Sequence, residues 1–444
     1  MGGFRFKLSA FLLISFSLHI YAIKEVFAHV IVGNLRTFNF TDWVSDIRIA
    51  QSSKIDGFVL NIAAHDPSNE HSLDLAFEAA SAVGNFKLLF SFDYRAQGPW
   101  SRDAVTELLR KYTRHPAYFK HDGKRPFVST FEGAECAEDW PAIKAATNAF
   151  FVPDWSSVSA AHAVKLAGGV VDGLFSFKAW PSGRENMTTD MDDTFRAALG
   201  ARRVYMMPVS PWFYTNLPGF GGKNWMWRGD GLWDRRWRQV IKIQPDFVQI
   251  LTWNDFGESH YIGPIPEKAL GLFQVANAPI NYAQGVTHDG WRKFLPYYIE
   301  VYKTGKAPQQ VDENVYAYYR TTPAYACPNG GTSGGSAAHG ESVMPPEHLV
   351  DDNVFFSTLL NTDHGVTITV RIGDNEQTGV FTEFPAAGRG TPGVYTGSVP
   401  FAGRTGDVVV AVLRGSKVIS RIGGGKPIAN ICENGTQNWN AVAI

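Results

Sequence analysis

The stretch "DFVQILTWNDFGES", residues 246–259, decides the fold of the first part of the chain. It opens with a short uninterrupted apolar run, which is the pattern of a strand covered on both faces, and passes directly into polar and aromatic residues. Similar runs precede it, separated by amphipathic stretches such as residues 101–114. They lie at residues 29–34, 56–66, 86–94, 125–133, 149–157, 172–181 and 202–214.

Eight such strands with helices between them predict a (β/α)8 TIM barrel. The helical pattern "DGWRKFLPYYIEVYKTG", residues 289–305, would complete it, so we expect the barrel to span residues 29–305. A doubly wound open sheet is the alternative. It is disfavoured because the first strand leads into "VGNLRTF", residues 32–38, which lacks a glycine-rich phosphate loop.

The hydrophobic pattern of the sequence changes beyond residue 305. Short alternating runs, separated by Gly, Pro, Asn and Asp, predict a C-terminal all-β sandwich over residues 306–444. Within this region lies "CPNGGTSGGSAAHGES", residues 327–342. Its composition predicts a flexible Gly/Ser-rich loop, because it offers little apolar surface to bury.

Residues 1–28 are typical of a secretory signal peptide. Arg5 and Lys7 precede an apolar stretch that ends at Ala22, too short for the roughly 20 residues of a bilayer span. The small-residue site Val26-Phe27-Ala28 predicts cleavage near Ala28. We therefore expect a protein secreted to the medium or the cell wall, with no membrane contact once the signal is removed. An uncleaved anchor is the alternative.

Export makes the cysteines candidates for disulfides. Cys327 and Cys432 would close the C-terminal region on itself and leave Cys136 as a buried free thiol, although all three pairings are possible. Asn39, Asn186 and Asn434 each open an Asn-x-Ser/Thr sequon. They predict surface positions in a glycoprotein.

Charge and composition narrow the class of ligand. Lys and Arg total 41 and Asp and Glu total 42, so the chain lacks the positive field that a nucleic acid would need. The 13 Trp, 16 Tyr and 31 Phe residues supply flat apolar faces for a core or for stacking on a ligand. We expect a monomer without a cofactor.

Nearly every predicted strand ends in a carboxylate or an aromatic residue. In a barrel the loops after the strands converge on one rim, so these side chains would line one site. Each could instead cap the helix that follows. The strands end in His65, Asp66, Asp93, Tyr94, Glu132, Asp154, Trp155, Trp180, Trp212, Tyr214, Trp253 and Asn254.

A tryptophan-rich stretch, residues 221–237, follows the seventh strand. We assign Trp225 and Trp227 to the ligand and Trp233 and Trp237 to packing. Carboxylates accept hydrogen bonds from hydroxyls, and indoles stack on the C–H faces of sugars. A rim of these groups without a basic cluster predicts a neutral, hydroxyl-rich ligand.

The cleavage chemistry is expected directly after the eighth strand. Hydrolysis of a glycosidic bond needs a carboxylic acid and a carboxylate, and Asp255 and Glu258 lie there three residues apart. A metal site with His260 is the alternative, but neither clustered His ligands nor an Asp-rich loop accompanies it, so no metal is expected. Otherwise His260 is a candidate substrate contact.

Other hydrolase chemistries have weaker support. Substrate-assisted catalysis would need alternating acids at the end of the fourth strand, where Glu132 stands alone. A serine hydrolase would need a Gly-x-Ser-x-Gly elbow, which the predicted barrel lacks. Glu132 remains a rival for the acid, because many barrel glycosidases carry their acid on the fourth strand.

Seven motifs of the predicted barrel resemble those of the fungal α-1,3-glucanases, or mutanases, of glycoside hydrolase family 71. They are "DGFVLNIAAHD", "KLLFSFDY", "FVSTFEG", "FVPDWSS", "MMPVSPWFYTNLPG", "KNWMWRGD" and "WNDFGESHYIGPI". The resemblance implies an inverting endo-hydrolase of α-1,3-glucan, a (β/α)8 barrel followed by a β-sandwich, and catalysis by Asp255 and Glu258. The chain departs from the family pattern at residues 33–43 and 93–100, which affects the expected subsites.

Our hypothesis for the reaction is a single displacement with Glu258 as acid and Asp255 as base. Inversion predicts carboxyl groups roughly 6.5 to 9.5 Å apart, whereas a separation near 5 Å is typical of retaining enzymes. Asp66, Asp93 and Asp154, with His65 and Tyr94, would bind sugar hydroxyls around the scissile bond. The alternative function is a non-catalytic cell-wall polysaccharide-binding protein on the same scaffold.

Overall fold

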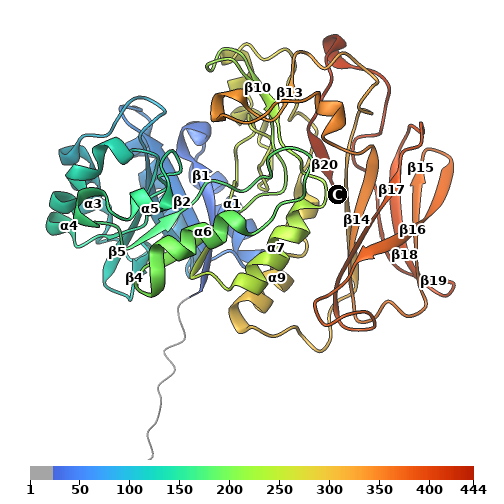
Figure 1. The fold of residues 1–444 in the computed structure, drawn as a ribbon, viewed down its shortest axis with the longest axis horizontal. Coiled ribbons are helices and arrows are strands. Elements are labelled where there is room, and N and C mark those ends of the chain that lie inside the picture. The colour runs from blue at the N-terminus through green and yellow to red at the C-terminus, as the bar shows by residue number, and fades with distance from the viewer. Residues whose placement is uncertain (1–23) are drawn as a thin grey trace, which may run out of the picture.

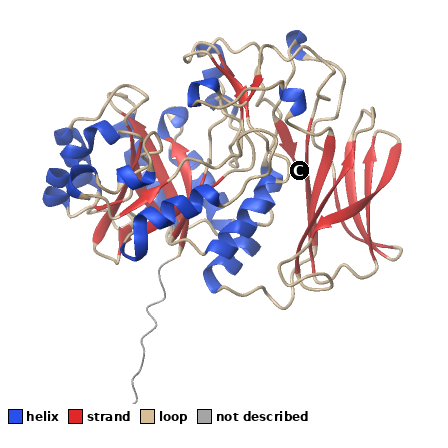
Figure 2. Ribbon diagram, in the orientation of Figure 1, coloured by secondary structure: helices blue, strands red, loops and turns tan. Residues whose placement is uncertain are grey.

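The computed structural model describes residues 24–444, so most of the predicted signal peptide lies outside the described residues. Two large sheets dominate the molecule (Figure 1). Helices surround the first sheet, whereas the second is nearly bare of them (Figure 2). The predicted mixed α/β architecture followed by a β-rich region is confirmed. Among residues 24–444, no helix combines the length and the apolar character that a bilayer span requires.

The first sheet is curled and almost entirely parallel, and we call it the parallel sheet. Its parallel strands are β1 (Glu25–Ile31), β2 (Gly57–Ala63), β3 (Lys87–Asp93), β5 (Arg125–Phe131), β6 (Phe150–Phe151), β7 (Gly173–Phe175), β8 (Val204–Val209) and β11 (Phe247–Ile250). Each pairs with its neighbour in chain order, except that β6 and β7 form no ladder and Asp154, which follows β6, bridges to Phe175 of β7. The short β4 (Lys120–His121) pairs antiparallel with β5. Strand β1 pairs with both β2 and β11, the first strand thus lying beside the last.

The connections between these strands contain the α-helices. They are α1 (Phe40–Ser52), α2 (Asn69–Val83), α3 (Arg102–Tyr112), α4 (Trp140–Thr147), α5 (Ala160–Ala163), α6 (Asp190–Leu199), α7 (Leu232–Ile243) and, after β11, α8 (Leu272–Val275) and α9 (Leu295–Thr304). Helix α3 follows the predicted amphipathic stretch and is capped by Ser101, whose hydroxyl accepts a hydrogen bond from the backbone N–H of Ala104.

The start of β1 corrects the predicted cleavage near Ala28. Strand β1 begins at Glu25, and Val26, Phe27 and Ala28 are fully buried in it. They pair in register with β11, and Phe27 and Ala28 also with β2. Cleavage at Ala28 would remove half of a central strand, so it is incompatible with this fold.

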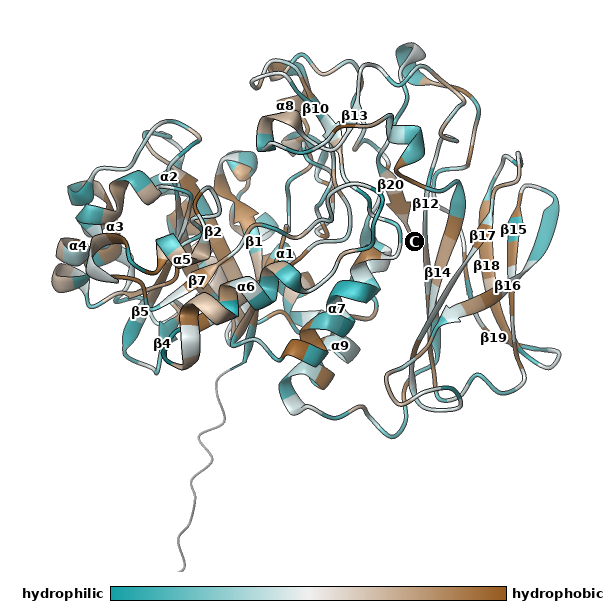
Figure 3. Cartoon of the chain, in the orientation of Figure 1, coloured by the Kyte–Doolittle hydropathy of each residue, from teal (hydrophilic) through white to brown (hydrophobic). Residues whose placement is uncertain are grey.

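The second large sheet is antiparallel, and we call it the C-terminal sheet. Its strands are β12 (Asn314–Arg320), β14 (Asn353–Leu360), β15 (Val366–Ile372), β16 (Asn375–Glu383), β17 (Gly393–Pro400), β18 (Val408–Arg414), β19 (Lys417–Ile422) and β20 (Ala441–Ala443). They form one hydrogen-bonded path, in the order β19-β18-β15-β16-β17-β14-β12-β20. Because β12 also packs against β18 and β19, the sheet folds back on itself around a core of its own. Hydrophobic residues lie along the strands of both sheets (Figure 3).

The two sheets are joined through α7 and α9, which lie between them (Figure 1). The carboxylate of Asp234 on α7 is buried and accepts hydrogen bonds from the hydroxyls of Tyr316 at 2.7 Å and Ser357 at 2.6 Å. The hydroxyl of Tyr298 on α9 donates to the same carboxylate. These bonds satisfy a buried charge with donors from both parts of the chain and tie the parts together.

The predicted flexible loop, residues 327–342, instead contributes a short strand to a third, small sheet. This sheet consists of β9 (Tyr214–Leu217), β10 (Lys223–Met226) and β13 (Ser333–Gly334). The backbone N–H of Gly335 donates to the carbonyl of Met226 at 2.8 Å. A glycine-rich segment needs no apolar side chains to dock in this way, because backbone pairing to an exposed strand edge holds it.

Candidate active site

The loop after β11 folds so that the carboxylates of Asp255 and Glu258 lie close together. The backbone N–H of Thr252 donates to the carbonyl of His260 at 2.8 Å, which closes the loop at its base. The Thr252 hydroxyl accepts from the N–H of Asp255 at 2.8 Å, and an Asp255 carboxylate oxygen accepts from the N–H of Glu258 at 2.9 Å. The three-residue spacing thus forms a turn that Asp255 itself stabilises.

Glu258 lies between two positively charged or polar partners. The Lys223 Nζ atom is 2.6 Å from Oε1 of Glu258, and Nε2 of His260 is 3.1 Å from Oε2. The same His260 nitrogen lies 3.6 Å from Oδ2 of Asp255. One oxygen from each carboxylate lies within 4.8 Å of the other. This separation is shorter than the roughly 6.5 to 9.5 Å expected of an inverting pair.

The surroundings shift the pKa values of Asp255 and Glu258 in opposite directions. Burial, and then the charge of Glu258, raise the pKa of Asp255 to about 6. Burial also acts to raise the pKa of Glu258, but the Lys223 charge and the His260 hydrogen bond outweigh it and hold that pKa well below its usual range. The environment therefore favours a proton on Asp255 and a charge on Glu258, the reverse of the roles assigned from the sequence.

An aromatic cavity of about 280 Å³ opens beside Glu258, and we call it the aromatic cavity. Trp180 and Trp227 stack in its wall, with ring centroids 5.2 Å apart and planes inclined by 18°. Phe213 stacks on His260 with centroids 5.6 Å apart. The other polar residues of its lining are Glu132, Ser156, Ser157, Lys178, Lys223, His339 and Glu341. Indole faces and scattered hydrogen-bonding groups suit a sugar.

Glu132 enters the aromatic cavity from the end of β5, in a backbone conformation that side chains rarely adopt. Its φ is 54°, and its carboxylate accepts from the hydroxyl of Ser157. Burial raises the pKa of Glu132. Left-handed backbone in a residue other than glycine is often kept at functional sites. Glu132 therefore remains a candidate functional carboxyl group of the aromatic cavity.

The predicted site residues divide into two groups. The aromatic cavity brings together Glu132, Trp180, Trp225, Trp227 and Glu258, and His260 and Asp255 lie against them. His65 and Asp66 follow the end of β2, Asp93 is the last residue of β3, and none of them lines the cavity; the carboxylates of Asp66 and Asp93 bond neighbouring residues instead. Asp66 accepts from Ser68 and Asp93 accepts from the N–H groups of Arg95 and Ala96.

Several predicted ligand contacts are corrected because their side chains are buried in packing. Trp253 donates to the Asp46 carboxylate at 2.8 Å, Trp212 donates to the carbonyl of Trp439 at 3.0 Å, and Asn254 bonds both the N–H and the C=O of Ile31. The same correction applies to Tyr94, Trp155 and Tyr214. An aromatic residue at a strand end does not reveal from sequence alone whether it faces the cavity or the core.

Asp154 also cannot contact a substrate, because it is fully buried. It bridges Phe131 at the end of β5 and Phe175 of β7, so it lies where β6 is too short to connect them. One carboxylate oxygen accepts from Ser156, and Oδ2 has no hydrogen-bond partner among the described residues. Burial, with the charge of Glu132, raises the pKa of Asp154 to about 8.

Among the charged and titratable residues that line the cavity, Lys223, His339 and Glu341 were missed from the sequence, whereas Lys178 lies at the predicted end of the sixth strand. Lys223 could have been found, since Lys223, Trp225 and Trp227 alternate and therefore share one face of a strand. His339 and Glu341 come from the segment predicted to be a flexible loop. Its composition carried no signal for a ligand site.

Asp255, Glu258 and His260 also form the cluster that could offer three ligands to a metal ion, with ligand atoms within 4.8 Å of one another. The Lys223 ammonium already supplies a positive charge at 2.6 Å from Glu258. The Lys223 charge thus offsets that of Glu258.

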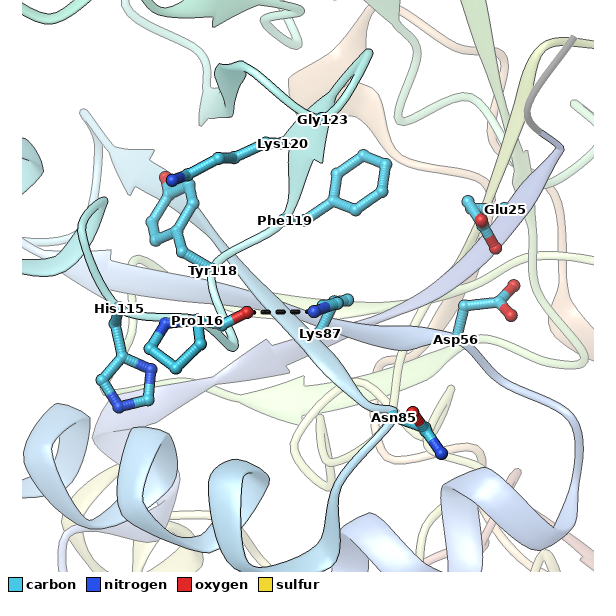
Figure 4. Close-up of a pocket in the computed structure, with 10 residues that line it drawn as sticks. All are labelled: Glu25, Asp56, Asn85, Lys87, His115, Pro116, Tyr118, Phe119, Lys120 and Gly123. Carbon is cyan, nitrogen blue, oxygen red and sulfur yellow. Dashed lines mark hydrogen bonds between the residues drawn. The ribbon is translucent and has the colours of Figure 1, made fainter.

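A second cavity, of about 450 Å³, lies at the opposite ends of the strands (Figure 4). Asp56, Lys87 and Glu25 line it, and Lys87 donates to the carbonyl of Pro116 at 2.9 Å. Residues at this end of parallel strands commonly serve stability. Lys303 is consistent with that role, since it joins Asp56 at 2.6 Å and Glu25 at 3.1 Å.

The remaining predicted positions are placed as follows. Cys327 and Cys432 form a disulfide with Cα atoms 6.2 Å apart, and Cys136 is a free, half-buried thiol. Asn39, Asn186 and Asn434 are all exposed, although Asn39 also caps α1. The sequons therefore lie on the surface.

Comparison with known proteins places this geometry in context. The sequence profile of glycosyl hydrolase family 71 matches residues 22–444. The chain is 36% identical over 421 residues to a mutanase of Penicillium rubens, covering 92% of this chain and 86% of that protein. It is 33% identical over 414 residues to a glucan endo-1,3-alpha-glucosidase of Schizosaccharomyces pombe, covering 89% and 91%. An ascus wall endo-1,3-alpha-glucanase of the same yeast is 28% identical over 371 residues, covering 79% and 81%.

Proposed function

The chain belongs to glycosyl hydrolase family 71, and from this premise we propose that it hydrolyses α-1,3-glucan. The observation that carries the proposal is the Asp255–Glu258 pair, which adjoins an aromatic cavity and is held by Lys223 and His260. Endo cleavage is part of the proposal, since two relatives are named as endo-acting enzymes on this linkage.

The scaffold we propose is a (β/α)8 barrel over the first part of the chain, with residues 306–444 as a separate β domain. Two features support the barrel: β1 lies beside both β2 and β11, and Asp154 bridges β5 to β7. The loops that hold Glu132, Trp180 and Glu258 then follow the carboxyl ends of the strands, where barrel enzymes carry their active sites.

In the proposed reaction Asp255 is the acid and Glu258 is the base. Asp255 transfers its proton to the glycosidic oxygen as the bond from that oxygen to the anomeric carbon breaks. Glu258 takes a proton from the water whose oxygen bonds to that carbon. Lys223 and His260 keep Glu258 ionised, and burial keeps the proton on Asp255. The donated proton thus starts on Asp255, and Glu258 starts ionised and able to accept the proton of the water.

We propose that the anomeric configuration is inverted, in agreement with the single displacement that the family resemblance implies. The nearest oxygens of Asp255 and Glu258 lie within 4.8 Å, so the pair must separate when a sugar and a water enter. Proton NMR of the first products tests this step. Initial release of the β-anomer supports inversion. Initial release of the α-anomer would overturn it in favour of a double displacement, whose carboxyl groups stand about 5 Å apart.

We also propose export to the medium or the cell wall. The sequence of residues 1–22 and the three exposed sequons support this proposal, and one relative is named an ascus wall enzyme. Cleavage must then precede Glu25, because β1 begins there. The partner we expect is the polysaccharide itself, met by a monomer.

The decisive experiment measures reducing-sugar release from insoluble α-1,3-glucan, with α-1,4-glucan and β-1,3-glucan as controls. Release from the first substrate alone supports the proposal. Binding without release from any glucan would overturn it and favour a polysaccharide-binding protein. Glu132→Gln belongs in the same assay, because loss of activity there, with full activity in Asp255→Asn and Glu258→Gln, would move the chemistry to Glu132.

A further inference from the structure

We propose that residues 336–341 form a wall of the aromatic cavity and hold a glucosyl unit of the chain, one removed from the cleaved bond, against Trp227. In this proposal Glu341 is the residue that positions the Trp227 ring. The inference rests on the proposed function and deepens it, since it adds a specificity-determining subsite built from the part of the chain that follows the parallel sheet.

The order of the rings places Trp227 away from the cleavage point. His260, which contacts both catalytic carboxylates, lies 5.2 Å from Trp180 and 5.6 Å from Phe213, centroid to centroid. Trp227 lies beyond them, 5.2 Å from Trp180 and 4.2 Å from Phe213. Trp180 is therefore nearer to the cleaved bond, and Trp227 is one ring further along the cavity.

Strand β10 gives the same order along the backbone. Lys223 and Trp225 lie in β10, and Trp227 follows it directly with its backbone N–H bonded to the carbonyl of Phe213, so the three alternate along one extended segment. Lys223 marks the position of Glu258. At about 3.4 Å per residue of extended chain, Trp227 lies on the order of 14 Å along the backbone from Lys223. This span exceeds one sugar ring, so Trp227 faces a neighbouring unit of the polymer.

Glu341 fixes the orientation of the Trp227 indole. Its Oε2 atom accepts a hydrogen bond from Nε1 of Trp227 at 2.6 Å and another from the backbone N–H of Ser336 at 2.9 Å. The backbone N–H of Glu341 donates to the carbonyl of Ser336 at 3.2 Å, which closes the turn. A ring held in this way loses less freedom when a sugar stacks on it.

His339 completes the wall with a group that can bond a sugar hydroxyl. Its ring centroid lies 5.6 Å from that of Trp225 and 5.9 Å from that of Trp227, and the residue lines the cavity. Burial, and then the charge of Lys178, lower the pKa of His339. A neutral imidazole carries both a donor and an acceptor, which matches a hydroxyl.

Backbone pairing holds the wall in place. Strand β13 pairs with Trp225 and Met226 of β10, and Gly335 must be glycine-like because its φ is 87° and a Cβ there would lie 2.8 Å from the carbonyl oxygen of Ser342. The disulfide from Cys327 to Cys432 also ties the chain that leads into residues 336–341 to a segment near the C-terminus. The segment is thus a fixed part of the cavity.

The test compares kcat and KM on α-1,3-gluco-oligosaccharides of increasing length for Glu341→Ala, Glu341→Gln and Trp227→Phe. Glu376→Gln, at an exposed position of the C-terminal sheet, is the matched control. We expect Glu341→Ala to raise KM about tenfold on substrates long enough to reach Trp227. Its kcat, and its KM on the shortest substrate that is cleaved, should stay nearly unchanged. Glu341→Gln should restore KM, since its amide oxygen still accepts from the indole.

A double variant separates positioning from direct contact. If Glu341 acts through Trp227, then Glu341→Ala combined with Trp227→Phe raises KM no further than Trp227→Phe alone. An equal loss of kcat on substrates of every length, or an unchanged KM on the longest, would overturn the inference.

Failure of the proposed function can be told apart from failure of this inference. If the wild-type protein releases no sugar from α-1,3-glucan, the function fails, and quenching of tryptophan fluorescence by the same oligosaccharides then tests the wall. Weaker binding of the long oligosaccharides to Glu341→Ala supports it. The inference is overturned if Glu341→Ala and the wild type bind the long oligosaccharides with equal affinity, or if the oligosaccharides do not quench the fluorescence of the wild type.

Discussion

The Lys223 ammonium lies 2.6 Å from a carboxylate oxygen of Glu258, although the residues are separated by 35 positions in the chain. Lys223 belongs to β10 and Glu258 to the loop after β11, so the contact forms only when the two segments meet over the end of the parallel sheet. Because His260 contacts the other oxygen, Lys223 and His260 together hold the pKa of Glu258 well below its usual range, while burial and the charge of Glu258 raise the pKa of Asp255 to about 6.

Replacing Lys223 should change the pH profile of the enzyme. Lys223→Met removes the charge that lowers the pKa of Glu258, so that pKa rises and the acidic limb of kcat moves to higher pH. We expect kcat to fall about tenfold or more, since each unit of pKa corresponds to about 1.4 kcal/mol. Lys223→Arg should recover part of it. A profile with its acidic limb unmoved would contradict this account of the pair.

The basic limb should report Asp255. Its pKa of about 6 predicts that activity declines as pH rises through 6, because the acid loses its proton. The limb belongs to the coupled pair and should be read as an apparent value. A profile of kcat/KM measured from pH 4 to 9 on soluble oligosaccharide checks it, and a decline that begins only above pH 8 would contradict it.

A substrate that needs no proton separates the acid from the base. Asp255→Asn should lose activity on glucan by at least about a hundredfold but retain it on α-glucosyl fluoride, whose leaving group departs unprotonated. Glu258→Gln should be inactive on both, because the water still needs a base. Retention of fluoride hydrolysis by Glu258→Gln, with loss in Asp255→Asn, would restore the assignment made from the sequence.

Asp154 should make stability depend on pH. Its folded pKa of about 8 lies above the unfolded value of about 3.9, so its contribution is fully present below pH 3.9 and is lost as pH rises through 8. Asp154→Asn cannot ionise. The variant should therefore match the wild type near pH 4 and exceed its Tm near pH 8, in thermal unfolding at several pH values. Equal Tm values at pH 8 would show that Asp154 is not protonated in the fold.

The mature N-terminus should lie at or before Glu25. Val26 donates to the Asp56 carboxylate at 2.7 Å, and the Phe27 ring packs against Phe119 with centroids 5.0 Å apart. N-terminal sequencing of the secreted protein checks the position. A chain that starts at His29 should not accumulate in folded form, and full activity from such a chain would contradict the role of β1.

The architecture was predictable because burial on both faces leaves a continuous apolar run in the sequence. The run at residues 246–259 became β11 and the loop with Asp255 and Glu258, and the stretch at 101–114 became α3. The ends of the elements were harder to predict. The site Val26-Phe27-Ala28 matches the small-residue pattern of a cleavage site and also forms the buried start of β1.

The site could be predicted only in part, because residue type does not determine where a side chain points. Trp180 and Trp227 face the aromatic cavity, whereas Trp212 and Trp253 occur in the same context of strand ends and are buried in the core. Glu341 could not be predicted at all. Its segment is held by backbone hydrogen bonds, which any sequence can make.

By itself the sequence determined the alternation of buried strands and helices, the position of Asp255 and Glu258 after the last parallel strand, and the family to which the chain belongs. These properties follow from local pattern, since the apolar and polar pattern of consecutive residues indicates which strands are buried and in what order they occur. Only the tertiary structure raises the pKa of Asp255, lowers that of Glu258 and decides which residues line the aromatic cavity. Those properties depend on Lys223, His339 and Glu341, whose charges and hydrogen bonds reach the site from segments distant in the chain.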